Sequence, residues 1–403
     1  MAHHEAGWSV HLVESRAWLG GRAWSRSKGG QGPELDNGPH VILGCYDAFR
    51  RLLRSLGSEH LFDQATVLRL SFLSRGGRIQ RLAPPALPAP LHLAAGLLRI
   101  EGLSWSDKLG LLATAIRPFL PLPDSNESLG HWMQRKRIGD AARSLIITPL
   151  CRAILNVEPD EASAKLFLST LREAFAGGRR HSAFWAPKVG WSEILDRPAQ
   201  ARFARAGIRL SLENPALGLE ARLGRCPAVR LRDGTLLEDQ DRVVLALPWN
   251  VTHKLLVQDG FVDGEEERMG GGIQPAPSLT VHLDRPEGSL PFEDAVMGLV
   301  DGTPFHFVVR QSDDQGRARK GTWTGMLAGA AFGLDGLPAA EIVDVALDQL
   351  RDLVGRQEPW PDSVRDPAPL VRRGRAATRA LPRPADHPPR PGRGHTPGLH
   401  ASR

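Results

Sequence analysis

The residues with the clearest chemical meaning lie near the N-terminus, in residues 10–22, V-H-L-V-E-S-R-A-W-L-G-G-R. An apolar strand that ends in Glu14 suits the second strand of a dinucleotide-binding βαβ unit, where the carboxylate accepts hydrogen bonds from a ribose diol. Gly20 and Gly21 allow backbone N–H groups to approach a pyrophosphate closely, and Arg22 adds a matching positive charge. The alternative is a surface strand and turn that carry an incidental acid.

A second candidate segment covers residues 34–41, E-L-D-N-G-P-H-V. Asn37 and Gly38 form a turn signal, and Gly38 permits a close backbone approach to a flat ligand. An ordinary turn uses the same two residue types, so this segment alone leaves both interpretations open.

Together, the two segments resemble the flavin-containing amine-oxidase-like oxidoreductases, in which E-x-R, L-G-G-R and a D-x-G-x-H-like segment recur at about this spacing. Within that superfamily the sequence is more similar to the squalene-associated, FAD-dependent desaturases and hydroxysqualene dehydroxylases of hopanoid biosynthesis. The resemblance runs from about residue 6 to about residue 355. The blocks that carry it are residues 34–46, 148–156 (T-P-L-C-R-A-I-L-N), 161–171 (E-A-S-A-K-L-F-L-S-T-L), 178–180, 187–191 and 243–248 (V-V-L-A-L-P).

The resemblance implies FAD as the cofactor. We expect no metal, because no cysteine or carboxylate cluster accompanies His3 and His4. It identifies no catalytic residue. His40 is a candidate proton donor only because it should lie near the flavin ring, and a structural histidine bonded to the backbone fits equally well. By position, the resemblance assigns Glu14 to the ribose, Arg16, Gly20, Gly21 and Arg22 to the pyrophosphate and flavin approach, Gly38, His40 and Val41 to the isoalloxazine ring, and Leu247 and Pro248 to the nucleotide.

The reaction expected from the resemblance is the reduction of hydroxysqualene to squalene with loss of water. Such a reaction needs a long apolar pocket, a flavin edge and a proton source for the departing hydroxide. Residues 82–123 and 279–310 supply apolar side chains for the pocket. A phytoene-type isoprenoid desaturase and an amine oxidase-like enzyme remain alternatives, although Tyr46, the one tyrosine of the chain, is little material for an aromatic amine cage.

These residues must be positioned by strands and helices, and the order of the expected strands and helices predicts an α/β fold. A FAD/NAD(P)-binding Rossmann-like domain, without its first strand and glycine turn, should occupy residues 1–66 and 207–270. A substrate domain of helices and an antiparallel sheet should occupy residues 67–206 and 271–355. Residues 361–403 are rich in Arg and Pro and are expected to form a disordered tail.

Local patterns predict the individual elements. A helix should begin at Asp47 and stop at Gly57, and Gly76 and Gly77 should turn a hairpin over residues 66–82. The segment around residues 10–14 should be a buried strand. Further helices are expected over residues 91–99, 106–119, 140–155, 160–176 and 339–354, and strands over 229–231, 243–247, 279–283, 296–300 and 305–310, the last three in an antiparallel meander.

The net charge of +6 is confined to one segment. Residues 362–403 hold nine Arg and three Asp, so residues 1–361 are electrically balanced. A nucleic-acid-binding role for the tail is an alternative, but the tail has no aromatic residue for base stacking. We therefore expect no nucleic-acid partner.

Both ends depart from the family pattern. The first strand and its G-x-G-x-x-G turn are absent, and no G-D segment follows residue 360. We expect weak or no FAD binding as a result, and an inactive truncated product is a further alternative. The composition of residues 365–403 resembles translation of GC-rich DNA in a wrong frame, and a genuine disordered tail would share it.

Three scattered cysteines, Cys45, Cys151 and Cys226, predict no disulfide framework and a cytoplasmic location. No signal peptide and no stretch long enough to span a bilayer are present. The Leu/Ala-rich residues 82–123 are compatible with peripheral contact at the inner membrane surface. They could equally cap the substrate domain. The oligomeric state stays open.

Overall fold

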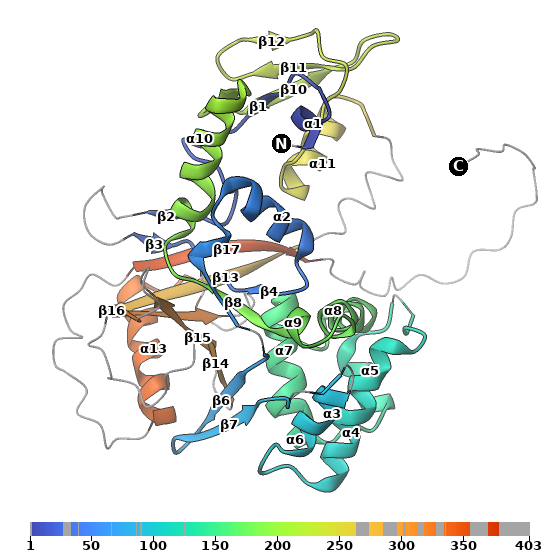
Figure 1. Ribbon diagram of the computed structural model, residues 1–403, viewed down its shortest axis with the longest axis vertical. Coiled ribbons are helices and arrows are strands. Elements are labelled where there is room, and N and C mark those ends of the chain that lie inside the picture. Colours follow the sequence, from blue (N-terminus) through green and yellow to red (C-terminus); the bar gives the residue numbers. More distant parts are fainter. Residues whose placement is uncertain are drawn as a thin grey trace, which may run out of the picture.

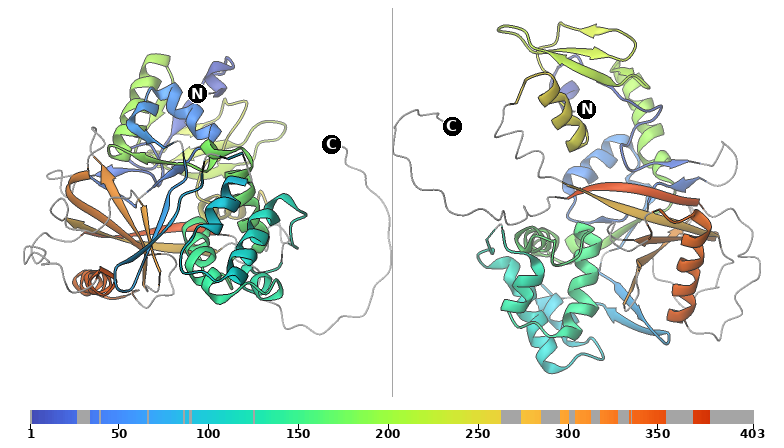
Figure 2. Two further views of the ribbon diagram at one scale, coloured as in Figure 1. Left: turned by 60° about the horizontal axis from the view of Figure 1, so that its bottom comes forward. Right: turned by 180° about the vertical axis from the view of Figure 1, so that it is seen from behind.

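The computed structural model describes residues 2–26, 34–38, 40–65, 67–85, 87–88, 91–124, 126–262, 274–284, 296–300, 304–312, 318–327, 334, 336–354 and 370–378. A large twisted sheet lies between a single helix on one face and a cluster of helices on the other (Figure 1). The N-terminal strand and its partners form the end of the molecule that lies away from this cluster of helices. The view from behind shows the same arrangement (Figure 2).

The N-terminal part is built around one parallel pair of strands, β1 and β9. The strand predicted here is confirmed, but its predicted burial is wrong: all three residues of β1 are half-exposed, because β9 is its only neighbour in the described sheet. The elements of this part are α1 (Ala2–Glu5), β1 (His11–Val13), α10 (Arg197–Ala206), β9 (Arg209–Ser211), β10 (Ala216–Glu220), β11 (Ala228–Leu231), β12 (Leu236–Leu237) and α11 (Trp249–Gln258).

A middle part joins this end to the large sheet. The helix predicted from Asp47 is confirmed as α2, and it ends at Gly57 in the left-handed conformation with φ +75°. Its buried side chain, Leu53, packs with Phe62 and Trp191. The elements are β2 (Ser25–Arg26), β3 (Leu35–Asp36), β4 (Ile42–Leu43), α2 (Asp47–Leu56), the 3₁₀ turn Glu59–Leu61, β5 (Phe62–Gln64) and β8 (Phe184–Pro187).

The large sheet has seven strands in the order β17-β13-β16-β15-β14-β6-β7. Its helix, α13 (Ala339–Val354), buries Ile342 and Leu350 against Val281 and Met297 on one face. The hairpin at Gly76 is confirmed. The strands are β6 (Leu70–Ser74), β7 (Arg78–Leu82), β13 (Gln274–Asp284), β14 (Val296–Leu299), β15 (Phe305–Ser312), β16 (Ala318–Leu327) and β17 (Leu370–Thr378).

The predicted meander is only partly right. Strands β14, β15 and β16 do follow one another as antiparallel neighbours, but β13 pairs with β16 instead of β14. Strand β14 instead pairs in parallel with β6, from the first quarter of the chain. Strand propensity cannot select between these neighbours, because every strand edge offers the same backbone groups.

The predicted helices over residues 91–99, 106–119, 140–155 and 160–176 are confirmed in the cluster on the other side of the sheet, with a π-helical turn inside the third. The core of this cluster holds Trp132, Phe167 and Cys151, all almost fully buried. The elements are α3 (Leu91–Leu98), α4 (Trp105–Ile116), the 3₁₀ turn Arg117–Phe119, α5 (Leu129–Arg135), α6 (Asp140–Ala142) with a π-helical turn Arg143–Ile147 leading into α7 (Thr148–Leu155), α8 (Ala164–Ala176) and α9 (Arg179–Ser182). Of these helices, α5 and α9 were not predicted. No helix in the described part of the chain has the length and hydrophobicity needed to cross a bilayer.

Two predictions along the later chain need correction. Residues 243–247 are not a strand: Val243 and Leu245 pack against Leu219 and Val229, and no strand in the described part of the chain pairs with them. The tail is not wholly irregular either, since Leu370–Thr378 forms β17 along β13. An unpaired sheet edge offers N–H and C=O groups that a segment of almost any composition can bond.

The domain boundaries expected from the sequence stay a prediction. One contact bears on them: α10 falls in the range expected for the substrate domain, yet its Phe203 packs with Leu12 and Leu19 of the N-terminal part. Gly355 and residues 361–369 and 379–403 lie outside the described residues.

Candidate functional site

The candidate site begins where β1 ends, at Glu14. The Glu14 N–H donates to the carbonyl of Ser211 at 2.8 Å, which fixes the end of the strand against β9. Its Oε1 accepts hydrogen bonds from the backbone N–H of Arg16 at 2.9 Å and from the hydroxyl of Ser15 at 3.0 Å. Within the described residues Oε2 makes no hydrogen bond. A half-exposed carboxylate with one oriented oxygen and one unengaged oxygen suits a ribose hydroxyl.

The glycine turn after β1 is fixed by Arg16. Gly20 and Gly21 have φ values of +110° and +59°, and a Cβ on Gly20 would meet the carbonyl oxygen of Ala23 at 2.5 Å. The Arg16 guanidinium donates to the Gly21 carbonyl at 2.8 Å. The family resemblance assigns Arg16 to the pyrophosphate. In the structure, one guanidinium N–H of Arg16 closes the glycine turn that would hold this pyrophosphate.

The two segments singled out in the sequence lie side by side. Asn37 donates from its backbone N–H to the carbonyl of Trp24 at 2.8 Å, and from its side chain to the carbonyl of Arg22 at 3.3 Å. These bonds continue the short β2–β3 ladder, in which Ser25 pairs with Asp36. The exposed Arg22 and the Gly38 backbone therefore belong to one continuous surface.

His40 is held by the backbone of its own segment. Its Nδ1 donates to the Gly38 carbonyl at 2.7 Å, and its ring meets Trp191 edge-on with centroids 5.5 Å apart. Burial lowers the pKa of His40 below its usual value; the bond to Gly38 opposes this shift, and the charge of Arg22 adds to it. A neutral ring bonded through Nδ1–H is a structural arrangement, and Val41 follows it half-buried, just before β4.

A buried polar network holds these segments from behind. The Ser25 hydroxyl donates to Asp36 and accepts from the backbone N–H of Trp191 at 2.5 Å. The Ser192 hydroxyl donates to the Ser25 carbonyl at 2.5 Å and accepts from the Ser25 N–H at 3.1 Å. Asp36 is the acid of the D-x-G-x-H-like segment, but no local pattern indicated Ser25 or Ser192 as members of this network.

A second junction joins residues 40–46 to the segment after α8. The N–H groups of Gly44 and Cys45 donate to the carbonyls of Ala183 and His181, both at 3.0 Å. A Cβ on Gly44 would overlap the carbonyl oxygen of Arg180. Only glycine allows this approach, so two blocks that carry the family resemblance meet at a residue with no side chain.

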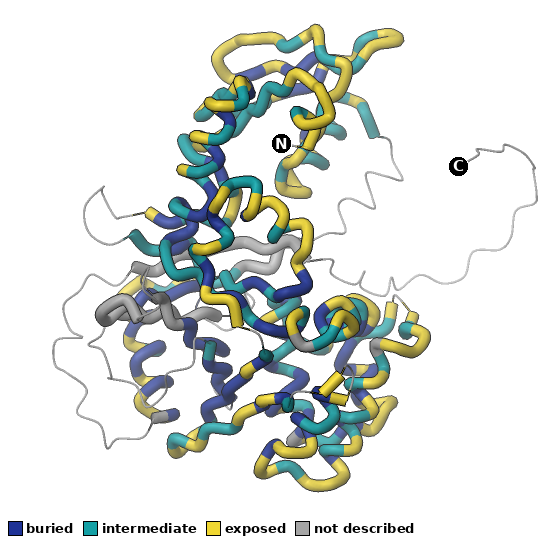
Figure 3. Tube along the Cα trace, viewed as in Figure 1, coloured by how far each residue is buried: buried dark blue, intermediate teal, exposed yellow. Residues whose placement is uncertain are grey.

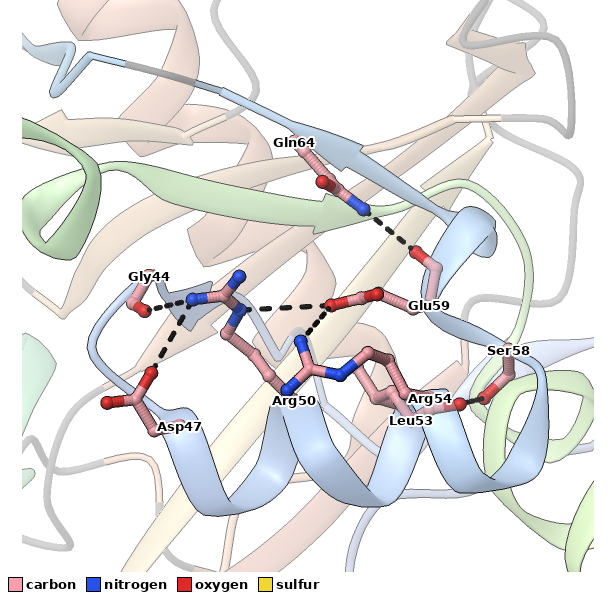
Figure 4. A network of polar contacts seen from close by, with 8 residues as sticks. All are labelled: Gly44, Asp47, Arg50, Leu53, Arg54, Ser58, Glu59 and Gln64. Atoms are coloured by element: carbon pink, nitrogen blue, oxygen red, sulfur yellow. Dashed lines mark hydrogen bonds and ion pairs between the residues drawn. The ribbon is translucent and has the colours of Figure 1, made fainter.

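Arg50 on α2 reinforces that junction. Its guanidinium donates to the Gly44 carbonyl at 3.2 Å and lies 3.5 Å from Asp47 and 3.9 Å from Glu59 (Figure 4). The same guanidinium lies over the ring of Trp185, 4.5 Å from its centre. Arg54 adds a bond to Glu59 at 3.1 Å. The first turn of α2 is thereby tied to the segment that follows His40.

Leu247 and Pro248 lie at the start of α11, where Pro248 is the N-cap residue. Leu245, just before them, packs in the same apolar cluster as Val13, the residue before Glu14. On the opposite side, the hydroxyl of Thr280 in β13 lies 3.4 Å from the position a Cβ of Gly38 would take. The large sheet therefore reaches the glycine segment directly.

Comparison with known proteins places this arrangement in a family. Residues 4–376 match the profile of the flavin-containing amine oxidoreductases. The chain belongs to that family.

Two relatives of this chain carry names that refer to isoprenoid substrates, hydroxysqualene and phytoene. The chain is 28% identical over 252 residues to a hydroxysqualene dehydroxylase of Rhodopseudomonas palustris, covering 60% of this chain and 57% of that protein. It is 26% identical over 302 residues to a 15-cis-phytoene desaturase of Synechococcus elongatus, covering 69% and 61%. The chain thus spans about three fifths of the length of these relatives.

Solved structures agree on the fold. An oxidoreductase from Methanosarcina mazei superposes with a TM-score of 0.67 at 14% sequence identity, covering 94% of this chain and 85% of that one. The predicted α/β FAD-binding fold is therefore confirmed, and FAD is the cofactor that this family membership brings to the site. The contact of each named residue with FAD stays a prediction.

The described residues fit that cofactor. The half-exposed Glu14 carboxylate, the side-chain-free Gly20–Gly21 turn and the exposed Arg22 match a ribose, a pyrophosphate and its charge in turn. Gly38 has no side chain that would keep a flat ring away, and the hydroxyl of Thr280 lies 3.4 Å from the position that a Cβ would take.

Proposed function

We propose that this chain is a FAD-dependent oxidoreductase that acts on an apolar isoprenoid, with hydroxysqualene as substrate and squalene and water as products. The observation that carries the proposal is the bonded connection of Glu14, the Gly20–Gly21 turn and the Gly38–His40 segment into one surface. The relatives named as hydroxysqualene dehydroxylases support the choice of substrate.

In this proposal the chain's own residues bind and orient. Glu14 would hold a ribose through Oε2, the glycine turn and Arg22 would hold a pyrophosphate, and Gly38 and Val41 would hold the flavin ring. Bound in its reduced form, FAD would supply the hydride that replaces the hydroxyl at the allylic carbon. Loss of that hydroxyl as water consumes one proton from the solvent, so the hydride and the proton together balance the exchange of the C–O bond for a C–H bond. His40, neutral and committed to the Gly38 carbonyl, orients the segment and does not serve as that acid.

The remaining expectations extend the proposal. The cofactor part would be residues 1–66 and 207–270, and the substrate part residues 67–206 and 271–355. The protein would act in the cytoplasm, in peripheral contact with the inner membrane surface. An apolar substrate that partitions into lipid favours such a location.

A phytoene-type desaturase is the second candidate. The Synechococcus relative covers more of this chain than the Rhodopseudomonas one, at similar identity. A desaturase would use the same surface in the opposite redox direction, removing hydride from the hydrocarbon. The two candidates therefore share their cofactor residues and differ in substrate and direction.

Two measurements test the proposal. Fluorescence titration of the purified chain with FAD tests cofactor binding, which the missing G-x-G-x-x-G turn is expected to leave weak. Glu14→Gln should weaken it further, about tenfold, the effect of one lost charged hydrogen bond. The exposed Glu101→Gln variant is the matched control.

Anaerobic incubation of the chain with dithionite-reduced FAD and hydroxysqualene should yield squalene, detected by mass spectrometry. Phytoene desaturation with oxidised FAD, without squalene formation, would support the second candidate instead.

A further inference from the structure

The helical hairpin formed by α3 and α4 exposes large apolar side chains to solvent. Trp105, Leu109 and Leu91 keep 71%, 62% and 59% of their surface exposed. These helices lie at the end of the molecule opposite β10–β12 (Figure 1), and Figure 3 shows the exposed positions that run along them. The whole set, called here the α3–α4 face, is Leu87, Leu91, Leu98, Trp105, Leu109, Ile116, Phe119 and Leu120.

The pattern along α4 shows that the exposure is systematic. Trp105, Leu109 and Ile116 fall within about 40° of one another at 100° per residue, on one stripe of the helix. The buried residues Asp107, Leu111 and Thr114 fall on the opposite stripe. The outward stripe of α4 is thus apolar and exposed, whereas the inward stripe packs on the core through Leu111, with Asp107 and Thr114 beside it. A helix that is merely part of a solvent-exposed cap would place polar residues on the outward stripe.

Charges frame the α3–α4 face and have one predominant sign. The ammonium of Lys108 lies 5.2 Å from the ring centre of Trp105, and Arg99 and Arg117 follow α3 and α4. Glu101 is exposed between the helices, whereas Asp107 is buried and bonded to the N-cap Ser104. Tryptophan beside lysine, next to exposed leucines, is the side-chain combination that suits a lipid–water boundary.

We propose that the α3–α4 face docks on the surface of an anionic lipid bilayer. Trp105, Leu109 and Leu91 enter the boundary between headgroups and acyl chains, while Arg99, Lys108 and Arg117 contact the phosphates. The attachment is peripheral, since the helices are 8 and 12 residues long and lie on the surface of the fold. The proposal stands on these contacts alone, and does not require that hydroxysqualene is the substrate.

Flotation with vesicles tests the docking directly. The full chain should float with vesicles of phosphatidylcholine and phosphatidylglycerol, and less with phosphatidylcholine alone. The double variant Trp105→Glu/Leu109→Glu should reduce the partition coefficient at least about tenfold, because it removes two apolar insertions. The matched control is Leu217→Glu/Leu223→Glu, which changes two exposed leucines at the far end of the molecule and should float like wild type.

Two further arms decide between explanations. Arg99→Glu/Lys108→Glu should abolish the preference for phosphatidylglycerol if the basic rim contacts headgroups. Sedimentation velocity without lipid tests whether the α3–α4 face instead joins two copies of the chain. Absence of flotation with anionic vesicles, equal flotation of the Trp105→Glu/Leu109→Glu variant, or a dimer that this variant dissociates would each overturn the proposal. FAD titration of the same variants shows whether the cofactor surface is unaffected.

Discussion

The hydroxyl of Ser25 donates a hydrogen bond to Oδ1 of Asp36, and the two side chains are only 1% and 3% exposed. The same hydroxyl accepts from the backbone N–H of Trp191, 166 positions away in sequence. One small polar residue therefore joins the glycine turn, the Asn37–Gly38 turn and the segment that leads into α10.

Removing this hydroxyl should destabilise the fold. Ser25→Ala leaves the Asp36 carboxylate and the Trp191 N–H without their shared partner, which costs about 1–3 kcal/mol for buried groups. Urea unfolding followed by circular dichroism measures the change. Ser106→Ala, at an exposed position on α4, should shift the midpoint little. Equal stability of Ser25→Ala and wild type would show that the network contributes nothing.

Gly44 should not tolerate a side chain. Gly44→Ala places a methyl group against the carbonyl of Arg180, and such overpacking costs about 1–3 kcal/mol. Because residues 40–46 would be displaced, FAD binding should weaken as well. Gly110→Ala is the control. Gly110 lies within α4, and a Cβ there would contact no other atom within 4 Å, so the variant should be neutral or more stable by up to about 1 kcal/mol. Thermal denaturation and FAD titration distinguish the two.

His306 should make the fold less stable in mild acid. Burial, with the charge of Arg152 nearby, lowers the pKa of this ring to about 3 in the folded protein. The unfolded chain, with a pKa near 6.5, binds the proton first, so stability falls as pH decreases through about 6.5 toward 3.

Between pH 7 and pH 5 this group alone should remove about 2 kcal/mol of unfolding free energy. His306→Gln should therefore flatten the pH dependence of urea unfolding by a comparable amount. His131→Gln, at an exposed position on α5, controls for the loss of a histidine. An unchanged slope in the His306 variant would mean that the ring is not buried as described.

The three cysteines should react in a fixed order. Burial raises the pKa of Cys151 to about 12, and burial also raises the pKa of Cys45. Cys226 is half-exposed. A short iodoacetamide pulse on the native protein should therefore label Cys226 first, and all three should react in urea. Peptide mass spectrometry measures this, and native labelling of Cys151 would contradict the packing of α7.

The sequence by itself determined the local features of this protein. Glu14 at a strand end, the αL stop of α2 at Gly57 and the hairpin at Gly76 were all predictable, because side-chain period and glycine freedom act within a few residues. The family could also be predicted, since its blocks lie in such local segments.

Tertiary structure alone decided the neighbours. Strand β13 lies beside β16, residues 243–247 find no strand partner in the described sheet, and residues 370–378 join an edge that their composition did not suggest. The Ser25–Asp36–Trp191 contact and the uncovered stripe of α4 are likewise features that only the tertiary structure decided. Hydrogen-bond partners and core contacts between distant segments depend on how the whole chain packs, and no local pattern encodes that choice.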